Sequence, residues 1–241
     1  IGDSCLDLTE ELKKDSRFAT VPLTLQVDDT MVIDDDTFDQ KAFLDLVKAS
    51  ENCPKSACPS PDAFKQVMEC DEDDVYIITL SSHLSGSYNS AVIGKELYEE
   101  EHGADHKNIL VIDSESASAG ELNLALGICE MYEEGLDFQA ISEKIMKKRD
   151  DENIYFVLDT LDFLRKNGRL TGLQAFFATA LNIKPIMGAD KGVIIKLDQA
   201  RGINKAFAKM CEFAVKEAGE SEKKRVIIAH CNCPERAAQV K

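Results

Sequence analysis

The sequence contains no hydrophobic run that approaches the roughly 20 apolar residues needed to span a bilayer. Its amino end, Ile1-Gly2-Asp3-Ser4, lacks the basic and apolar regions of a secretory signal peptide. From these two absences we expect a soluble, cytoplasmic protein with no stable insertion into a membrane.

Positive charge is also scarce in this chain. Its 241 residues include 28 Lys and Arg against 44 Asp and Glu, which gives a formal net charge of -16. A chain with this balance repels polyanions. We therefore expect neither nucleic acid nor an anionic membrane surface as a partner, and phosphate binding only at local basic patches.

The cysteine pattern lacks the spacing of a disulfide framework or a zinc site. The 8 cysteines are scattered through the chain, which favours reduced thiols in a cytosol. The best candidate zinc ligands are His230, Cys231 and Cys233, but no second ligand pair stands at a finger-like distance from them. We expect no metal site, and His230 fits a residue that ends a strand.

The phosphate loops and nucleophile motifs of common enzymes are missing as well. No Gly-x-Gly-x-x-Gly or Gly-Lys-Ser/Thr run occurs, so the sequence predicts no nucleotide site. Ser85 follows a strand-like run but lacks the Gly-x-Ser-x-Gly elbow, and His83 is too close in sequence to be the usual base. We predict no catalytic residue, while an enzyme that transfers an acyl or phosphoryl group at Ser85 remains the alternative.

The most informative segment that is present spans residues 75–91. An apolar run that fits a buried parallel strand leads into Ser85-Gly86-Ser87, where a helix begins. Such a helix start points N–H groups and hydroxyls at one place, which suits an anion. A second serine turn, which contains Ser56, precedes the helix before this strand. Both turns are expected at the carboxyl end of one sheet, although serines here could equally serve only as helix caps.

The order of elements predicts two α/β domains. In residues 1–152, strands alternate with helices, which indicates right-handed crossovers, a mainly parallel sheet and a three-layer α/β/α domain. After the charged stretch 147–152 the pattern changes. Residues 153–241 fit a two-layer domain with a mixed sheet, which includes a hairpin around residues 188–192, a helix over 203–218 and a strand over 225–229. The sequence stops within a predicted helix, so we expect this domain to be truncated at its carboxyl end.

A helix predicted over residues 172–181 is apolar on nearly all sides. This pattern is typical of a buried core helix, but one side could instead line an apolar cavity between the domains. Basic residues flank it, among them Arg169. On so acidic a chain they form either a solvated face or a local positive cluster.

Several collinear motifs together resemble the DegV family of bacterial fatty-acid-binding proteins, the lipid-carrier subunits of a fatty-acid kinase system. The matching segments are Asp3-Ser4-x-x-Asp7-Leu8, Val21-Pro22-Leu23, Pro59-Ser60-Pro61, Leu80-Ser81-Ser82-x-Leu84-Ser85-Gly86-Ser87-Tyr88-x-Ser90-Ala91, Ile112-Asp113-Ser114, Gly168-Arg169-Leu170, Asn182-Ile183-Lys184-Pro185-Ile186, Ala200-Arg201-Gly202 and Ala229-His230. They cover essentially the whole chain.

The resemblance implies a carrier rather than an enzyme. A long-chain fatty acid would lie between two α/β domains, with no other cofactor, and a separate fatty-acid kinase subunit would phosphorylate it to an acyl phosphate. The implied carboxylate ligands are Ser56, Ser85 and Gly86. The family's usual Thr-Ser pair is replaced here by Ser56-Ala57, which keeps the first hydroxyl only.

The resemblance also implies roles for residues of the second domain. Arg169 and Arg201 match basic positions that would face the kinase or the head group, and His230 is a further candidate for such a contact. The acyl chain would lie in an apolar tunnel, for which Phe176, Phe177 and Leu181 of the apolar helix are candidates. A pure interaction module, with a filled interior, is a third possibility.

Overall fold

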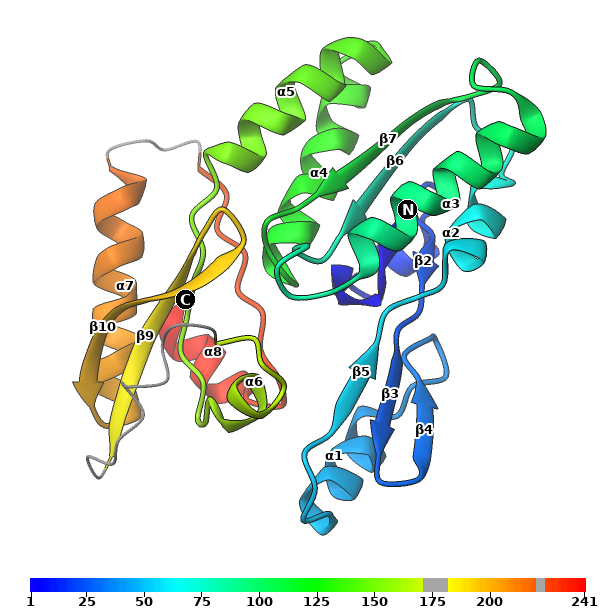
Figure 1. The fold of residues 1–241 in the computed structure, drawn as a ribbon. Helices are drawn as coiled ribbons and strands as arrows, with labels where there is room; N and C mark the ends of the chain where they lie inside the picture. Colours follow the sequence, from blue (N-terminus) through cyan, green and yellow to red (C-terminus); the bar gives the residue numbers. More distant parts are fainter. Residues whose placement is uncertain (171–181, 220–223) are drawn as a thin grey trace. The chain divides into compact units, whose positions relative to one another are not determined.

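The computed structural model describes residues 1–170, 182–219 and 224–241. The chain divides into two compact units, Ile1–Asp150 and Asp151–Lys241. The first holds two sheets and the second holds one (Figure 1). The prediction of an α/β fold with a parallel sheet is confirmed.

Sheet A forms the centre of the first unit. Its strands are β1 (Gly2–Asp3), β2 (Thr20–Val21), β6 (Asp74–Thr79) and β7 (Asn108–Asp113), in the order β2-β1-β6-β7. All of its pairings are parallel. Because the strands run in one direction, the loops that follow β1, β6 and β7 emerge at the same edge of the sheet.

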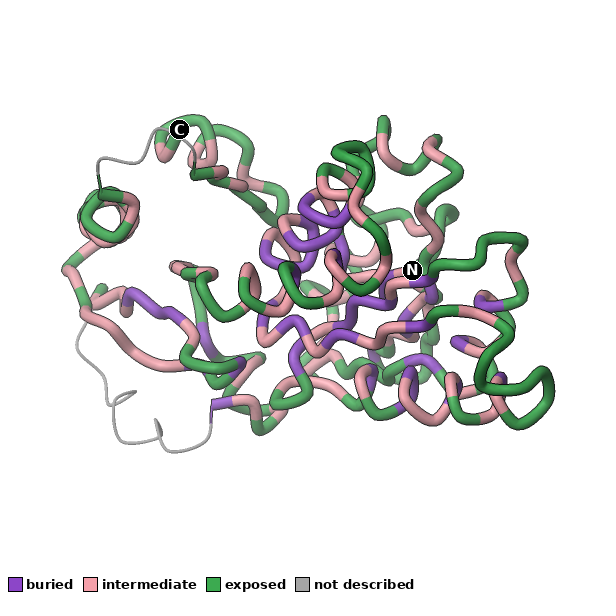
Figure 2. Tube along the Cα trace, turned by 90° about the horizontal axis from the view of Figure 1, so that it is seen from above, coloured by how far each residue is buried: buried purple, intermediate pink, exposed green. Residues whose placement is uncertain are grey.

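Helices cover both faces of sheet A, which gives the three predicted layers (Figure 1). On one face lie α2 (Pro61–Met68) and α3 (Ser87–His102); on the other lie α4 (Ala119–Glu133) and α5 (Phe138–Asp150). Side chains alternate across a strand, so Ile77 joins the core beside α2 and α3 while Ile78 joins the core beside α4 and α5. Figure 2 shows buried segments of the first unit in purple. Two apolar cores therefore hold the sheet.

Sheet B is a small antiparallel sheet of the same unit. It consists of β3 (Thr24–Val27), β4 (Thr30–Ile33) and β5 (Lys55–Ala57), in the order β4-β3-β5, and α1 (Gln40–Ala49) lies between β4 and β5 in the chain. The alternation over residues 21–27, followed by Asp28-Asp29-Thr30, predicts a hairpin arm, and the chain turns at Asp28, whose φ of 52° lies in the left-handed region. The segment expected as a serine turn is partly strand, because β5 pairs with β3.

The spacing of Leu8 and Leu12 predicts a helix near the start of the chain, but this helix does not form. In place of a helix that runs to about Lys14, the structure has two 3₁₀ turns, η1 (Ser4–Leu6) and η2 (Leu12–Lys14). Asp7 follows the first turn with φ 51° and ψ 48°. This left-handed residue ends the turn, so the apolar spacing of Leu8 and Leu12 does not continue it.

The second unit is built on sheet C. Its strands β8 (Tyr155–Phe156), β9 (Ile183–Asp190) and β10 (Val193–Arg201) lie in the order β10-β9-β8. The described strands pair antiparallel throughout, which corrects the expectation of a mixed sheet. The helices in the described part of this unit are α6 (Asp162–Lys166), α7 (Ile203–Ala218) and α8 (Pro234–Val240), and α7 packs against the strands.

The strand predicted over residues 225–229 is also absent from the described part of the second unit. These residues are extended without a pairing partner among the described strands. Val226 is 72% exposed, so the apolar alternation that suggested a strand does not bury a face here. An alternating pattern produces a strand only where a sheet edge is available to pair with it.

Candidate ligand site at the serine turns

The loop after β6 is held in place by backbone hydrogen bonds at the edge of sheet A. Ser81 N donates to Ser116 O at 2.9 Å, which ties this loop to the loop after β7. The N–H groups of Leu84 and Ser85 donate to Ser81 O at 2.9 and 3.0 Å. The chain is thereby turned so that Gly86 occupies the N-cap of α3, as the sequence predicts.

Ser85 carries its hydroxyl at this helix start. The side chain is half-buried, and its Oγ lies 3.0 Å from Ser87 Oγ and accepts a hydrogen bond from Ser87 N at 3.2 Å. Gly86 is exposed. The first N–H groups of an α-helix have no partner within the helix, so this position can bind an anion.

The turn that contains Ser56 lies beside the same helix start. Cys58 Sγ is 3.8 Å from Ser90 Oγ on α3, and a Cβ on Gly86 would lie 2.9 Å from Cys58 Sγ. Glycine at position 86 thus allows the close approach of the two turns. The structure brings Ser85 and Gly86 together with the Ser56 turn, and the Ser56 side chain is exposed.

Helix packing explains why these two turns stay together. A Cβ on Gly94 of α3 would lie 2.6 Å from the carbonyl oxygen of Pro61, the first residue of α2. The absence of a side chain at Gly94 lets the two helices approach closely. Ser60 caps α2 by accepting a hydrogen bond from Ala63 N at 3.2 Å, as the Ser-Pro pair predicts.

A buried carboxyl group supports the helix start from behind. Asp3, at the end of β1, is 0% exposed and accepts hydrogen bonds from Cys5 N at 3.0 Å and Leu80 N at 2.9 Å. Burial raises the pKa of Asp3. Sequence reasoning gave Asp3 no role of its own, although a strand-end Asp in the motif Asp3-Ser4-x-x-Asp7-Leu8 was the available signal.

The charged groups that act on Cys5, two residues after Asp3, are acidic. Burial, followed by the charges of Glu121, Asp3, Asp7 and Asp34, raises the pKa of the Cys5 thiol far above its ordinary value. Burial likewise raises the pKa of Asp34. A bound anion at Ser85 would be held by neutral hydroxyl and N–H donors.

The other predicted site residues belong to the second unit or fall outside the described residues. Arg169 donates from Nη1 to Asn167 O at 2.5 Å, and Arg201 is an exposed residue at the end of β10. His230 is exposed, and its Nδ1 accepts a hydrogen bond from Cys233 N at 3.3 Å. Phe176, Phe177 and Leu181 lie outside the described residues. Within the first unit, the structure places Ser85 and Gly86 beside Cys58, which follows Ser56 by two residues.

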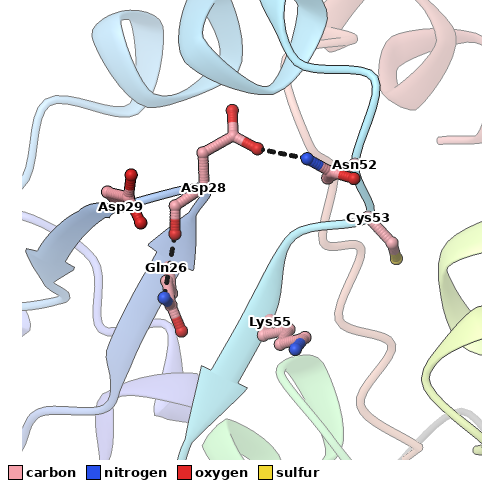
Figure 3. Close-up of a pocket in the computed structure, with 6 residues that line it drawn as sticks. All are labelled: Gln26, Asp28, Asp29, Asn52, Cys53 and Lys55. Carbon is pink, nitrogen blue, oxygen red and sulfur yellow. Dashed lines mark hydrogen bonds between the residues drawn. The ribbon is translucent and has the colours of Figure 1, made fainter.

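A separate pocket of about 460 Å³ lies on sheet B and is shown in Figure 3. Its lining residues are Gln26, Asp28, Asp29, Asn52, Cys53 and Lys55. The Asp28 carboxylate accepts hydrogen bonds from Asn52 Nδ2 at 2.6 Å and Ser50 Oγ at 3.0 Å, which lower its pKa. These polar and charged walls do not suit an acyl chain.

Comparison with known proteins identifies the family of the chain. The sequence profile of the DegV family matches residues 1–241. A DegV domain-containing protein of Streptococcus pyogenes serotype M18 is 36% identical over 245 residues, which cover 100% of this chain and 85% of that protein. The chain belongs to the DegV family.

Solved DegV structures share this fold. A DegV family protein from Ruminococcus gnavus, solved with vaccenic acid, is 44% identical with a TM-score of 0.95, and the match covers 99% of this chain and 85% of that one. The Fatty Acid Kinase (Fak) B3 protein of Streptococcus pneumoniae, loaded with linoleic acid, is 32% identical with a TM-score of 0.80, over 89% of this chain and 76% of that one. Both of these relatives hold a fatty acid.

Two further features bear on the chemistry of this DegV protein. Among the residues that the structure describes, no group of three His, Cys, Asp or Glu side chains is placed to hold a metal ion. Over the same ranges, none of the helices combines the length and the apolar character that crossing a membrane requires.

Proposed function

We propose that this DegV-family protein binds a long-chain fatty acid and holds its carboxylate at the two serine turns. The observation that carries the proposal is the helix start of α3, where Ser85 and Gly86 lie beside the Ser56 turn. The fatty acids held by the relatives from R. gnavus and S. pneumoniae support the choice of ligand.

The energetics of this ligand divide between its two ends. Burial of each methylene contributes about 0.8 kcal/mol, so a long acyl chain offers on the order of 10 kcal/mol before association costs. A carboxylate that loses its water needs replacement donors. In this proposal the Ser85 and Ser56 hydroxyls and the N–H groups at Gly86 are those donors. Phe176, Phe177 and Leu181 remain predicted contacts of the acyl chain.

We propose a carrier role rather than catalysis at Ser85. A nucleophilic serine needs a general base within hydrogen-bond reach. The Ser85 hydroxyl lies 3.0 Å from the hydroxyl of another serine, Ser87. The nearby His83 is exposed, and the hydrogen bond that it makes in this loop comes from its backbone, because His83 N donates to Ser81 Oγ at 3.3 Å. This arrangement supports binding of an anion and not its hydrolysis.

Ligand binding can be tested by native mass spectrometry on the purified protein, before and after extraction of lipid with organic solvent. The proposal expects a co-purified fatty acid and recovery of the complex when palmitate or oleate is added back. Failure to detect any fatty acid, together with no rebinding, contradicts it.

The carboxylate site can be tested with a matched pair of serines. Ser85→Ala removes a hydrogen bond to a charged group, so we expect an affinity lower by about 10- to 100-fold. Ser82→Ala changes an exposed serine of the same loop that contacts Asp113 through its backbone N–H at 3.1 Å, and should leave affinity unchanged. Equal affinities for the two variants would place the carboxylate elsewhere.

The name of the S. pneumoniae relative supports a second part of the proposal, namely that the bound fatty acid is presented to a separate kinase that forms an acyl phosphate. Arg201 and Arg169, with His230, are the proposed contacts to the kinase or the head group. Arg201→Ala is expected to slow phosphorylation of the loaded carrier while fatty-acid affinity stays the same, as measured by transfer of labelled phosphate from ATP. An unchanged rate rules out this role for Arg201.

A further inference from the structure

The loop that follows β6 is held by carboxylates at the ends of both neighbouring strands. Strand β6 lies between β1 and β7 in sheet A. Asp3, the last residue of β1, accepts a hydrogen bond from Leu80 N at 2.9 Å. Asp113, the last residue of β7, accepts one from Ser82 N at 3.1 Å. Since Ser81 N donates to a carbonyl oxygen of the loop after β7, the two neighbouring strands and their loops bind three consecutive N–H groups of this loop.

This arrangement determines where the Ser85 hydroxyl lies. The carbonyl oxygen of Ser81 accepts hydrogen bonds from the N–H groups of Leu84 and Ser85 at 2.9 and 3.0 Å, so a shift of the loop is passed directly to Ser85. Gly86, by contrast, is held by the helix, because its carbonyl oxygen accepts from Ser90 N at 2.9 Å. The loop therefore places the hydroxyl of the candidate site, while α3 places the N–H groups.

A single oxygen of Asp113 joins the loops after β6 and β7. Besides Ser82 N, Asp113 Oδ1 accepts a hydrogen bond from Glu115 N at 3.1 Å. Aspartate side chains often bind the N–H group two residues further along in this way. Glu115 has a φ of 53°, which lies in the left-handed region. A residue other than glycine keeps this backbone only where its surroundings hold it.

Arg149, near the end of α5, supports the same segment. Its Nη1 donates to the carbonyl oxygen of Asp113 at 3.4 Å, and its Nη2 lies 3.7 Å from Glu115 Oε1. The Arg149 side chain is only 16% exposed. These contacts attach the end of β7 to a helix, so Asp113 is a fixed support for the loop that carries Ser85.

We propose that Asp113 is a positioning residue of the ligand site, which sets the place of the Ser85 hydroxyl through its hydrogen bond to Ser82 N. This inference rests on the proposed function. Ser85 makes the contact with the fatty-acid carboxylate, and Asp113 acts through the position of its oxygen. Its charge does not help, because a negative charge repels a bound anion.

Two conservative substitutions separate the position of this oxygen from its charge. Asp113→Asn keeps an oxygen that can accept from Ser82 N and removes the charge, whereas Asp113→Glu keeps the charge and moves the oxygens outward by one carbon. Titration calorimetry of the delipidated variants with palmitate measures the affinity. We expect Asp113→Asn to bind within about threefold of the unaltered protein, and Asp113→Glu to bind about five- to tenfold more weakly, which corresponds to the loss of one hydrogen bond. Asp113→Ala, which removes the oxygen, should bind as weakly as Asp113→Glu.

A double variant tests whether the effect acts through Ser85. If Asp113 only places that hydroxyl, Asp113→Glu combined with Ser85→Ala should bind no more weakly than Ser85→Ala alone, whereas a separate structural role would multiply the two losses. The matched control is Asp74→Ala. Asp74 begins β6 at the opposite edge of sheet A, where its carboxylate accepts a hydrogen bond from Asn108 Nδ2 of β7 at 2.8 Å. This variant should leave palmitate affinity unchanged.

Three results overturn the inference: Asp113→Asn weakened as much as Asp113→Glu, Asp113→Glu and Asp113→Ala that bind as the unaltered protein does, or losses that multiply in the double variant. Weaker binding by Ser85→Ala leaves the proposed function standing in each of these cases. Failure of the unaltered delipidated protein to bind palmitate, or a Ser85→Ala variant that binds it unchanged, overturns the proposed carboxylate site itself.

Discussion

Replacement of Gly86 with alanine should weaken fatty-acid binding without unfolding the protein. The added Cβ would lie 2.9 Å from Cys58 Sγ and 3.9 Å from Cys58 Cβ. The backbone of Gly86, with φ -78° and ψ 0°, is one that alanine also adopts. The conflict therefore arises at the thiol and not in the backbone.

The size of the effect follows from this contact. Non-bonded carbon and sulfur atoms rest at separations of about 3.5–4.0 Å, so Cys58 must move by roughly 0.6–1.1 Å. Cys58 is exposed, so the turn that carries it can shift, and the stability cost should be near the lower end of the about 1–3 kcal/mol seen for overpacked cores. A shift of this size in the Ser56 turn exceeds the range of good hydrogen-bond distances, which is about 0.5 Å wide. We expect a loss of affinity of about tenfold, or about 1.4 kcal/mol.

Calorimetric titration with palmitate and urea denaturation measure the two quantities separately. The double variant Gly86→Ala, Cys58→Ala removes the sulfur that the new methyl group meets and should recover most of the affinity, while Cys58→Ala alone should change it little. If Gly86→Ala binds palmitate as well as the unaltered protein, or if the double variant recovers nothing, the two turns do not form one site through this contact.

Three further predictions concern the stability of the first unit. Ile78→Ala empties a core position that is 3% exposed and should lower the free energy of unfolding by about 2–5 kcal/mol, as read from urea denaturation. Ser60→Ala removes the N-cap of α2, because Ser60 Oγ accepts a hydrogen bond from Ala63 N at 3.2 Å. It should lower the free energy of unfolding by about 1 kcal/mol, and a change near zero would mean that the hydroxyl does not cap the helix. Burial raises the pKa of Asp3 and Asp34 above the ordinary value of 3.8, so the folded state keeps protons that the unfolded chain has released. The free energy of unfolding should therefore fall as pH rises from that value through the raised pKa, and Asp3→Asn should flatten this fall.

Local patterns in the sequence predict most of the helices because each has its own start signal. Ser60-Pro61 begins α2, and Asp39 caps α1 by accepting from Ala42 N at 2.9 Å. The predicted bounds of α7, residues 203–218, coincide with those in the structure. The hairpin of sheet C was equally visible, since Gly192, with φ 79°, stands in the tight turn between two apolar strands.

Features that depend on distant partners could not be predicted in the same way. Strand β5 is short and polar, with all of its residues exposed, and it is a strand only because β3 supplies its pairing edge. The predicted strand over 225–229 is the reverse case, because its apolar pattern finds no pairing edge in the described sheet C. Local sequence indicates a propensity for strand geometry but does not show whether a neighbouring strand is available to pair.

The candidate site likewise has a part that local sequence predicts and a part that depends on distant contacts. The anion-binding character of Ser85-Gly86 follows from the local order of strand, serine loop and helix, which is visible in sequence. The contact of Cys58 with the helix start and the hydrogen bonds of Asp3 join segments far apart in the chain. No periodicity encodes these tertiary contacts, so the contacts of Asp3 and Cys58 emerged only from the structure.

A crystal structure of the delipidated protein soaked with palmitate would decide whether the serine turns hold a fatty-acid head group. The palmitate carboxylate should lie within hydrogen-bond reach of Ser85 Oγ and of the N–H groups at Gly86, with the acyl chain shielded from solvent. Palmitate bound with its carboxylate away from Ser85, or an interior already filled by side chains, would contradict this assignment.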